Sequence, residues 1–461
     1  MLNRLEVDRA VFFMLASRVW QFLAGPVTIL LIVSRFSRET QGYYYTFGSL
    51  AALQTFVELG LHAVVLNLAS HEWSRLAWSP TERRIQGNAA AHARLCSLAR
   101  GALRWYFAAG AAFVMLVGFA GAWFLAQKDA AADWYWPWWG MIAATGGSVC
   151  LMSFIAILEG CQQNIVVGQY RLAQAMSSNF AVWACIVSGW GLWALAAAAW
   201  VRLASELALI GVRYRAFFAA IFQGDSGDGM NWRRDVWPLQ LRMALQSLFA
   251  WFAGSLFNVI IFQYQGPAAA GLFGMTWNIV MTMQLAALAW LQARAPLFGA
   301  LVARQDYREL DRVWYRVTRV SWAILATGGG LFLVVLALIN SVEVDRASLA
   351  GPVARFLHLI AQRMLPPLAA APFVAAAVLW HLPQSQAVYV KSHLIDPFTR
   401  LNAIGNSTIA VLAWWLGSRF GAAGAGWGYM AVVVLIFLPG YRVLWRRCRS
   451  DFAPAARSSN S

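Results

Sequence analysis

Apolar stretches long enough to cross a bilayer recur along the whole chain, and they constrain its fold more than any other feature. An α-helix needs about 20 such residues to cross the hydrocarbon core. In the first half the stretches cover residues 11–33, 43–69, 105–126, 134–158, 172–189 and 191–210. In the second half they cover 237–262, 266–291, 320–340, 356–380, 401–417 and 421–444. This pattern predicts an all-α polytopic membrane protein with about 12 transmembrane helices.

The composition supports a membrane location. Hydrophobic residues make up 60% of the chain and charged residues 12%, so most of it lacks the polar surface of a water-soluble fold. The first apolar stretch is longer than a signal-peptide core and no small-residue cleavage site follows it, so we expect it to remain as a span. We predict a bacterial inner-membrane protein. The five cysteines show no CxxC spacing, and we expect neither a zinc site nor any other metal or cofactor.

The formal net charge of +16 follows a pattern along the chain. If the N-terminus lies in the cytoplasm, most lysines and arginines fall in the two termini and the even-numbered connections. This bias predicts that both termini are cytoplasmic, and it explains the basic balance without nucleic-acid binding. The longest inner segments, 71–104 and 213–235, show no strand pattern and are predicted to be linkers or short surface helices.

One inner segment is periodic. Basic residues recur there at every fourth position, while apolar residues face elsewhere. The basic residues are Arg304, Arg308, Arg312 and Arg316, and the apolar ones are Val313, Trp314 and Val317. This predicts an amphipathic helix that lies on the anionic membrane lipids.

Six spans in each half make the second half enter the membrane in the same sense as the first. We therefore predict two pseudo-symmetric six-helix lobes around a central cavity. Residues 1–212 and 236–447 form the lobes, 213–235 a cytoplasmic linker and 448–461 a polar tail.

The spacing of two arginines supports the repeat. Arg18 precedes Gly42 by the same number of residues as Arg242 precedes Gly266, although a register that pairs Gly42 with Gly271 is also compatible with the sequence. Both arginines fall inside predicted spans, where they either snorkel to the inner headgroups or face a cavity. Facing a cavity, their planar charged groups suit a pyrophosphate. Gln21 and Gln246 follow the two arginines and extend this polar lining, or bridge helices.

Gln54, Glu58 and His62 are spaced by four in the second predicted span, which places them on one helical face. Either Glu58 neutralises Arg18 as a buried ion pair, or Glu58 and His62 exchange H⁺ or Na⁺ during transport. Arg202 and Glu206 are also four residues apart, and their charges are predicted to neutralise each other.

The N-terminal region resembles the opening of bacterial polysaccharide-export and O-antigen flippases, which belong to the multidrug/oligosaccharidyl-lipid/polysaccharide (MOP) superfamily. The matching features are Arg18 in the first span, "ETQGYYYTFGSL" at 39–50 and "ELGL" at 58–61. The segment "RFGAAGAGWGYM" at 419–430 resembles the start of the last span. The two further spans of the lipid II branch are absent, which disfavours that branch.

The resemblance implies a flippase that moves polyprenyl-diphosphate-linked oligosaccharide, as for O-antigen or lipopolysaccharide biosynthesis, from the inner to the outer leaflet by alternating access. Arg18, Gln21, Arg242 and Gln246 would then line the cavity, and polysaccharide assembly proteins are possible partners. A cation-coupled multidrug exporter of the same superfamily is the first alternative. An integral-membrane glycan polymerase or ligase is the second, but the outer connections are too short to carry such an active site.

Overall fold

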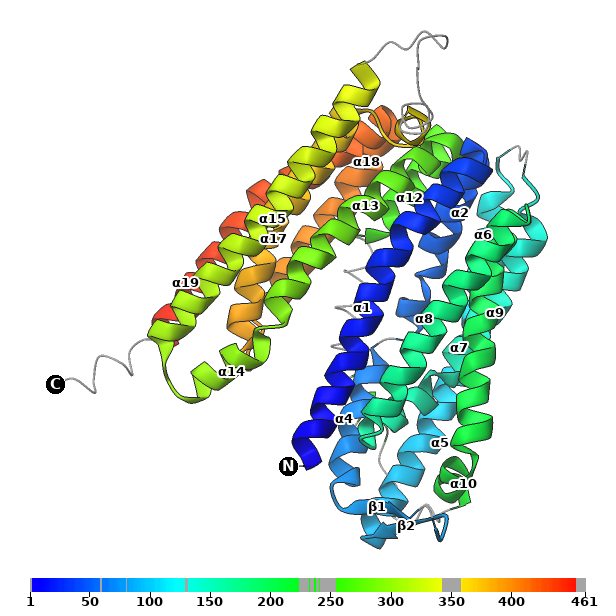
Figure 1. Cartoon of the computed structure of the whole chain (residues 1–461), viewed down its shortest axis with the longest axis vertical. Coiled ribbons are helices and arrows are strands. Elements are labelled where there is room, and N and C mark those ends of the chain that lie inside the picture. Colours follow the sequence, from blue (N-terminus) through cyan, green and yellow to red (C-terminus); the bar gives the residue numbers. More distant parts are fainter. Residues whose placement is uncertain are drawn as a thin grey trace, which may run out of the picture. The chain divides into compact units, whose positions relative to one another are not determined.

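In the computed structural model, the chain forms two compact units, Met1–Trp251 and Phe252–Ser461. The structure describes residues 2–58, 60–79, 81–128, 132–223, 232, 236–237, 240, 254–341 and 358–452, without the side chains of 2–11, 14–15, 18 and 57–58. Both units are built from helices, as the apolar stretches predict (Figure 1).

The first unit is a helical bundle. Its longest helices are α1 (Leu2–Arg35), α5 (Ala89–Ala112), α7 (Tyr135–Gly160), α8 (Asn164–Val187) and α9 (Trp193–Ala208). Short π-helical turns at Phe113–Val117 and Leu209–Arg213 lead from α5 into α6 (Gly118–Leu125) and from α9 towards α10 (Arg215–Gln223). The core forms where α4 (Leu61–Trp73), α5 and α7 meet, around buried residues such as Val65, Leu95 and Leu158.

The second predicted span is a broken helix. It consists of α2 (Arg38–Ala51), α3 (Gln54–Glu58) and α4, with a bend of 45° before α4. Gly60 adopts a left-handed conformation (φ 68°) at the start of α4, which a residue with a side chain rarely accepts. The prediction that Gln54, Glu58 and His62 lie along one continuous helix is therefore wrong, because the chain leaves helical geometry between Glu58 and Leu61.

The segment 71–104 also departs from the prediction. It contains an antiparallel hairpin of β1 (Leu76–Ser79) and β2 (Arg84–Gly87), in which Leu76 pairs with Gly87. Asn88 then caps α5 by accepting hydrogen bonds from the backbone N–H groups of Ala90 and Ala91. Four-residue strands are too short to give a clear alternating pattern, which explains why the hairpin was not predicted.

The second unit contains α12 (Leu256–Gln265), α13 (Pro267–Gln292), α14 (Ala295–Ala303), α15 (Tyr307–Ser341), α17 (Pro367–Lys391), α18 (Thr399–Val432) and α19 (Leu438–Phe452). The predicted spans 401–417 and 421–444 are two helical segments that meet at a break at Gly421 (φ 63°), within the residues labelled α18. They run back along each other, because a Cβ atom at Gly405 would overlap the Phe437 ring and one at Gly440 would lie 2.7 Å from Leu401. A π-helical turn at Val433–Phe437 joins α18 to α19.

The predicted surface helix is not a separate element. Arg308, Arg312 and Arg316 lie in the first turns of α15, which continues without a break into the apolar stretch. The apolar side chains Leu310, Trp314 and Val317 are buried, and the Trp314 indole donates to the backbone oxygen of Ser385 in α17. Protein therefore covers the apolar face of this helix where lipid was expected to.

Seven helical stretches of the described residues are long and apolar enough to cross a membrane, with Thr399–Phe452 counted once despite its break at Gly421. The bent α2–α4 stretch adds an eighth if it counts as one span. The α8 helix is not among them, and it carries the polar residues Arg171, Gln174 and Ser178. The fold is that of an all-α polytopic membrane protein, and the number twelve stays a prediction.

Candidate functional site

The first unit contains an open cavity of about 1100 Å³. It is lined by residues of α1, α2, α3, α4, α7, α8 and α9, and many of them carry hydrogen-bonding side chains. The polar lining residues are Ser17, Gln21, Gln54, His62, Thr145, Ser148, Glu159, Asn164, Tyr170, Arg171, Gln174, Ser178, Arg202 and Glu206. Polar groups at this density inside a membrane protein are costly unless water or a polar ligand meets them.

Glu159 is the centre of the first charged group. One carboxylate oxygen lies 2.9 Å from His62 Nε2 and the other 2.6 Å from Arg171 Nη2. The Glu159 side chain is 12% exposed, whereas that of Arg171 is 53% exposed. A largely buried carboxylate thus binds an imidazole on one side and an accessible guanidinium on the other.

The chain geometry around Glu159 brings these three groups together. The α7 helix ends at Gly160, and a short turn through Cys161 and Gln163 leads directly into α8, which carries Arg171. A Cβ atom at Gly160 would lie 2.6 Å from the Cβ atom of Ala69 in α4. Only glycine therefore lets the end of α7 approach α4, the helix that carries His62.

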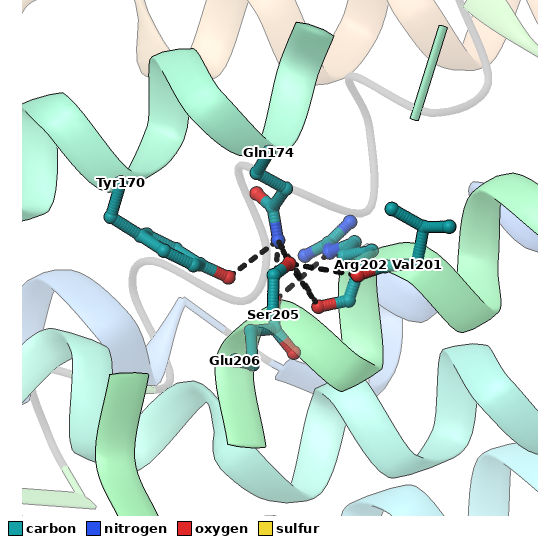
Figure 2. Close-up of polar contacts among 6 residues, drawn as sticks. All are labelled: Tyr170, Gln174, Val201, Arg202, Ser205 and Glu206. Atoms are coloured by element: carbon teal, nitrogen blue, oxygen red, sulfur yellow. Dashed lines mark hydrogen bonds and ion pairs between the residues drawn. The ribbon is translucent and has the colours of Figure 1, made fainter. Parts of the chain in front are cut away.

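A second polar group joins α8 to α9 (Figure 2). Arg202 donates to Glu206 Oε1 at 3.1 Å, so the predicted pairing of these residues is confirmed. The Gln174 amide nitrogen lies 2.5 Å from the Tyr170 hydroxyl and within 3.5 Å of Ser205 Oγ and Glu206 Oε1.

This second group has spare hydrogen-bonding capacity. The Gln174 amide has two hydrogens and faces more than two acceptors, so it can change partners at little cost. Glu206 Oε2 is buried and has no hydrogen-bond partner among the described residues. An unsatisfied buried oxygen beside a polar cavity is a place where a proton or a ligand donor can bind.

The described lining balances two arginines against two glutamates. Such pairs can open when an anion competes for the guanidinium or when a proton neutralises the carboxylate. The cavity can therefore bind a polar, hydrogen-bonding solute and can couple its charge state to proton uptake. Among the described residues, no group of three or more His, Cys, Asp or Glu side chains could hold a metal ion.

The predicted site residues have different outcomes. Gln21 and His62 line the cavity, and Gln54 lines it with them. Arg18 lies in α1 between the lining residues Ser17 and Gln21, but its side chain is outside the described part of the chain, as is that of Glu58 in α3. Arg242 and Gln246 lie outside the described residues altogether.

The helix starts bear on the proposed repeat. Gly42 is the fifth residue of α2, which begins at Arg38, and Gly271 is the fifth residue of α13, which begins at Pro267. Gly266 instead precedes α13 as its cap. The helix starts thus favour the register that pairs Gly42 with Gly271, in which Arg18 and Arg242 are not equally spaced. The spacing argument for pairing the two arginines is therefore weaker.

Two central residues, Glu159 and Arg171, were not predicted. In the sequence both fall at the ends of apolar stretches, where charged residues commonly face the interface. The signal that points to them is the short connection after α7, because it must bring a carboxylate and an arginine into reach.

No protein-family model and no curated protein sequence matches the chain. Solved structures do match over nearly its whole length. The lipid II flippase MurJ, in an inward closed conformation, aligns at 10% identity and a TM-score of 0.59, covering 95% of this chain and 87% of that one. An inward-facing multidrug resistance MATE family transporter of the MOP superfamily aligns at 14% identity and a TM-score of 0.54, and the alignment covers 93% of this chain and 99% of that one. A MOP superfamily transporter from Pyrococcus furiosus aligns at 14% identity and a TM-score of 0.53, and the alignment covers 96% of each chain. The chain therefore has the fold of these membrane transporters.

Proposed function

We propose that this protein is a flippase that moves a polyprenyl-diphosphate-linked oligosaccharide from the inner to the outer leaflet of the bacterial cytoplasmic membrane by alternating access. The observation that carries this proposal is the polar cavity of the first unit. Its volume of about 1100 Å³ slightly exceeds the range for small-molecule sites, which is about 300–1,000 Å³, and its amide and hydroxyl groups suit a glycan. The fold, which solved membrane transporters share, also supports a transport function.

Arg171 is the group best placed to bind the diphosphate. Its guanidinium is half exposed, and its only described ionic partner is the carboxylate of Glu159. A phosphate can replace the Glu159 carboxylate by accepting hydrogen bonds from two parallel N–H groups of the guanidinium. Arg202, 37% exposed and paired with Glu206, offers a second cation on α9.

The His62–Glu159–Arg171 group supplies a route for coupling to protons. When Glu159 takes up a proton, it loses its attraction for Arg171, and the guanidinium becomes available to phosphate. His62 beside it can accept or return that proton. This extends the predicted exchange at His62 to Glu159, while the roles of Arg18, Glu58, Arg242 and Gln246 remain proposals.

The orientation fits this loading step. With both termini in the cytoplasm, as the distribution of basic residues predicts, the end of α7 and the start of α8 face the inner leaflet. Glu159 and Arg171 would then meet the headgroup where it is made. Moving each net negative charge outward gains about 2.3 kcal/mol per 100 mV of membrane potential. We retain 1–212 and 236–447 as the two lobes that rock during transport.

A cation-coupled multidrug exporter is the second candidate. The presence of Glu159 and Glu206 in the cavity favours it, because carboxylates attract cationic drugs. The enzyme alternative gains no support, because the solved structures with this fold are transporters and a flippase.

Binding to the purified full-length protein in nanodiscs separates the two candidates. A tail-less diphosphate-linked sugar and a cationic dye are titrated in parallel. We expect the diphosphate to bind and to be displaced by inorganic pyrophosphate. Binding of the dye alone would refute the flippase and support the exporter.

A further inference from the structure

The first unit has a second hollow, on the outside of α1. It is a groove of about 400 Å³, and all of its lining side chains are aliphatic or aromatic. They are Phe12, Ala16, Val19, Trp20 and Leu23 of α1 and Leu172 of α8. Phe12, Val19 and Leu23 are each more than half exposed, so the groove is open at the surface of the first unit and wide enough for a long flexible chain to enter.

The groove and the polar cavity share the same two helices. On α1, Ser17 and Gln21 line the cavity, whereas the neighbouring Ala16 and Trp20 line the groove. On α8, Arg171 lines the cavity and the next residue, Leu172, lines the groove. Each helix therefore carries a polar face and an apolar face that lie about 100° apart around its axis.

Aromatic contacts fix the pairing of these helices. The Trp20 ring lies 5.6 Å from that of Phe180 and 6.0 Å from that of Trp183. The Trp183 indole also donates to Thr28 Oγ1 at 2.9 Å. Such packing holds α1 against α8, so the groove keeps a defined shape beside the cavity.

We propose that this groove holds the isoprenoid tail of the substrate whose diphosphate and glycan occupy the polar cavity; the inference rests on the proposed function. In a polyprenyl-diphosphate glycan, one phosphate ester joins an apolar chain to a charged polar head. A site for both parts needs a cation near an apolar surface, and α8 supplies both, with Arg171 on the face that lines the cavity and Leu172 on the next face, which lines the groove.

The groove orients the substrate more than it adds affinity. Bilayer hydrocarbon is as apolar as these side chains, so moving the tail from lipid into the groove gains little hydrophobic free energy. The gain is positional, because a held tail keeps the diphosphate near Arg171. The test must therefore locate the tail, since affinity alone would respond weakly.

Photolabelling of the full-length protein in nanodiscs shows where the isoprenoid tail binds. The probe is a polyprenyl-diphosphate-linked sugar with a diazirine in the tail, and a phosphatidylglycerol with a diazirine in its acyl chain is run in parallel. Val19→Trp fills the groove. Val27→Trp is the matched control, because Val27 is an exposed residue of the same helix outside the groove.

We expect the substrate probe to label the groove residues of α1 and α8 in the wild-type protein and in Val27→Trp, and to lose this label in Val19→Trp. Label that maps elsewhere in the wild-type protein would overturn the inference without any variant, as would label that survives Val19→Trp. Equal labelling by the phospholipid would also overturn it, because the groove would then be a general lipid site.

Binding of a tail-less diphosphate-linked sugar reports separately on the cavity. If that compound does not bind, the proposed function fails. If it binds while the tail label lies outside the groove, the present inference alone fails.

Discussion

Replacing Arg171 by alanine removes the more exposed of the two described cavity arginines and leaves the contact between His62 and Glu159 in place. A hydrogen bond to a charged group contributes about 1.5–3 kcal/mol, which corresponds to roughly 10- to 150-fold in a dissociation constant. Two features reduce the loss. Arg171 is 53% exposed, and binding phosphate requires it to leave Glu159, which lies 2.6 Å away. We therefore expect the lower end, with Arg171→Ala weakening diphosphate binding by about tenfold.

Isothermal titration calorimetry with a tail-less diphosphate-linked sugar measures this change. Arg171→Lys keeps the charge but loses the planar fork, so it should fall between the wild-type protein and Arg171→Ala. Arg104→Ala is the control, because Arg104 is an exposed arginine of α5 that does not line the cavity. If Arg171→Ala binds the diphosphate as tightly as Arg104→Ala does, Arg171 is not the phosphate ligand.

Three further variants test the coupling group and the fold. Glu159→Gln should preserve diphosphate binding, because Arg171 is freed, but should abolish the response of transport to a pH gradient across proteoliposomes. Gly160→Val should destabilise the protein by about 1–3 kcal/mol and lower its melting temperature in detergent, because its Cβ atom would lie 2.6 Å from that of Ala69. Burial lowers the pKa of His393 in the α17–α18 connection. As the pH drops below about 6.5, the imidazole therefore becomes protonated in the unfolded chain before it does so in the folded protein, and the free energy of unfolding falls. His393→Phe keeps a ring stacked on Phe452 and should reduce this acid-induced fall in melting temperature.

Each variant has a clear contrary result. Transport by Glu159→Gln that still responds to the pH gradient would exclude Glu159 as the coupling group. A melting temperature of Gly160→Val equal to that of the wild-type protein would show that α7 and α4 can separate at no cost. An unchanged pH dependence in His393→Phe would show that other groups cause the loss of stability in acid.

The long apolar stretches made most of the helices predictable. The predicted span 266–291 corresponds to α13, Pro267–Gln292, and the predicted span 134–158 to α7, Tyr135–Gly160. In both cases a continuous apolar run defines the helix, because a polar interruption would be costly inside the membrane. Short features were missed. The break at Gly60 and the β1–β2 hairpin depend on single backbone conformations and on pairing, which hydropathy does not encode.

The site was predictable only in part. His62 and Gln21 were predicted because polar residues inside an apolar run are conspicuous. Glu159 was not, because it lies 97 residues from His62 in the sequence and no local pattern joins them. Arg171 precedes the predicted span 172–189 and so resembles an ordinary interfacial arginine, whereas α8 in fact begins at Asn164 and carries it into the cavity lining.

Flipping in proteoliposomes tests the central claim most directly. A fluorescent polyprenyl-diphosphate-linked glycan is placed in both leaflets, and a membrane-impermeant quencher reports how fast the inner pool reaches the outer surface. We predict that the wild-type protein empties the inner pool much faster than protein-free vesicles, and that Arg171→Ala is slower than Arg104→Ala. A wild-type rate equal to that of protein-free vesicles would contradict the proposed function.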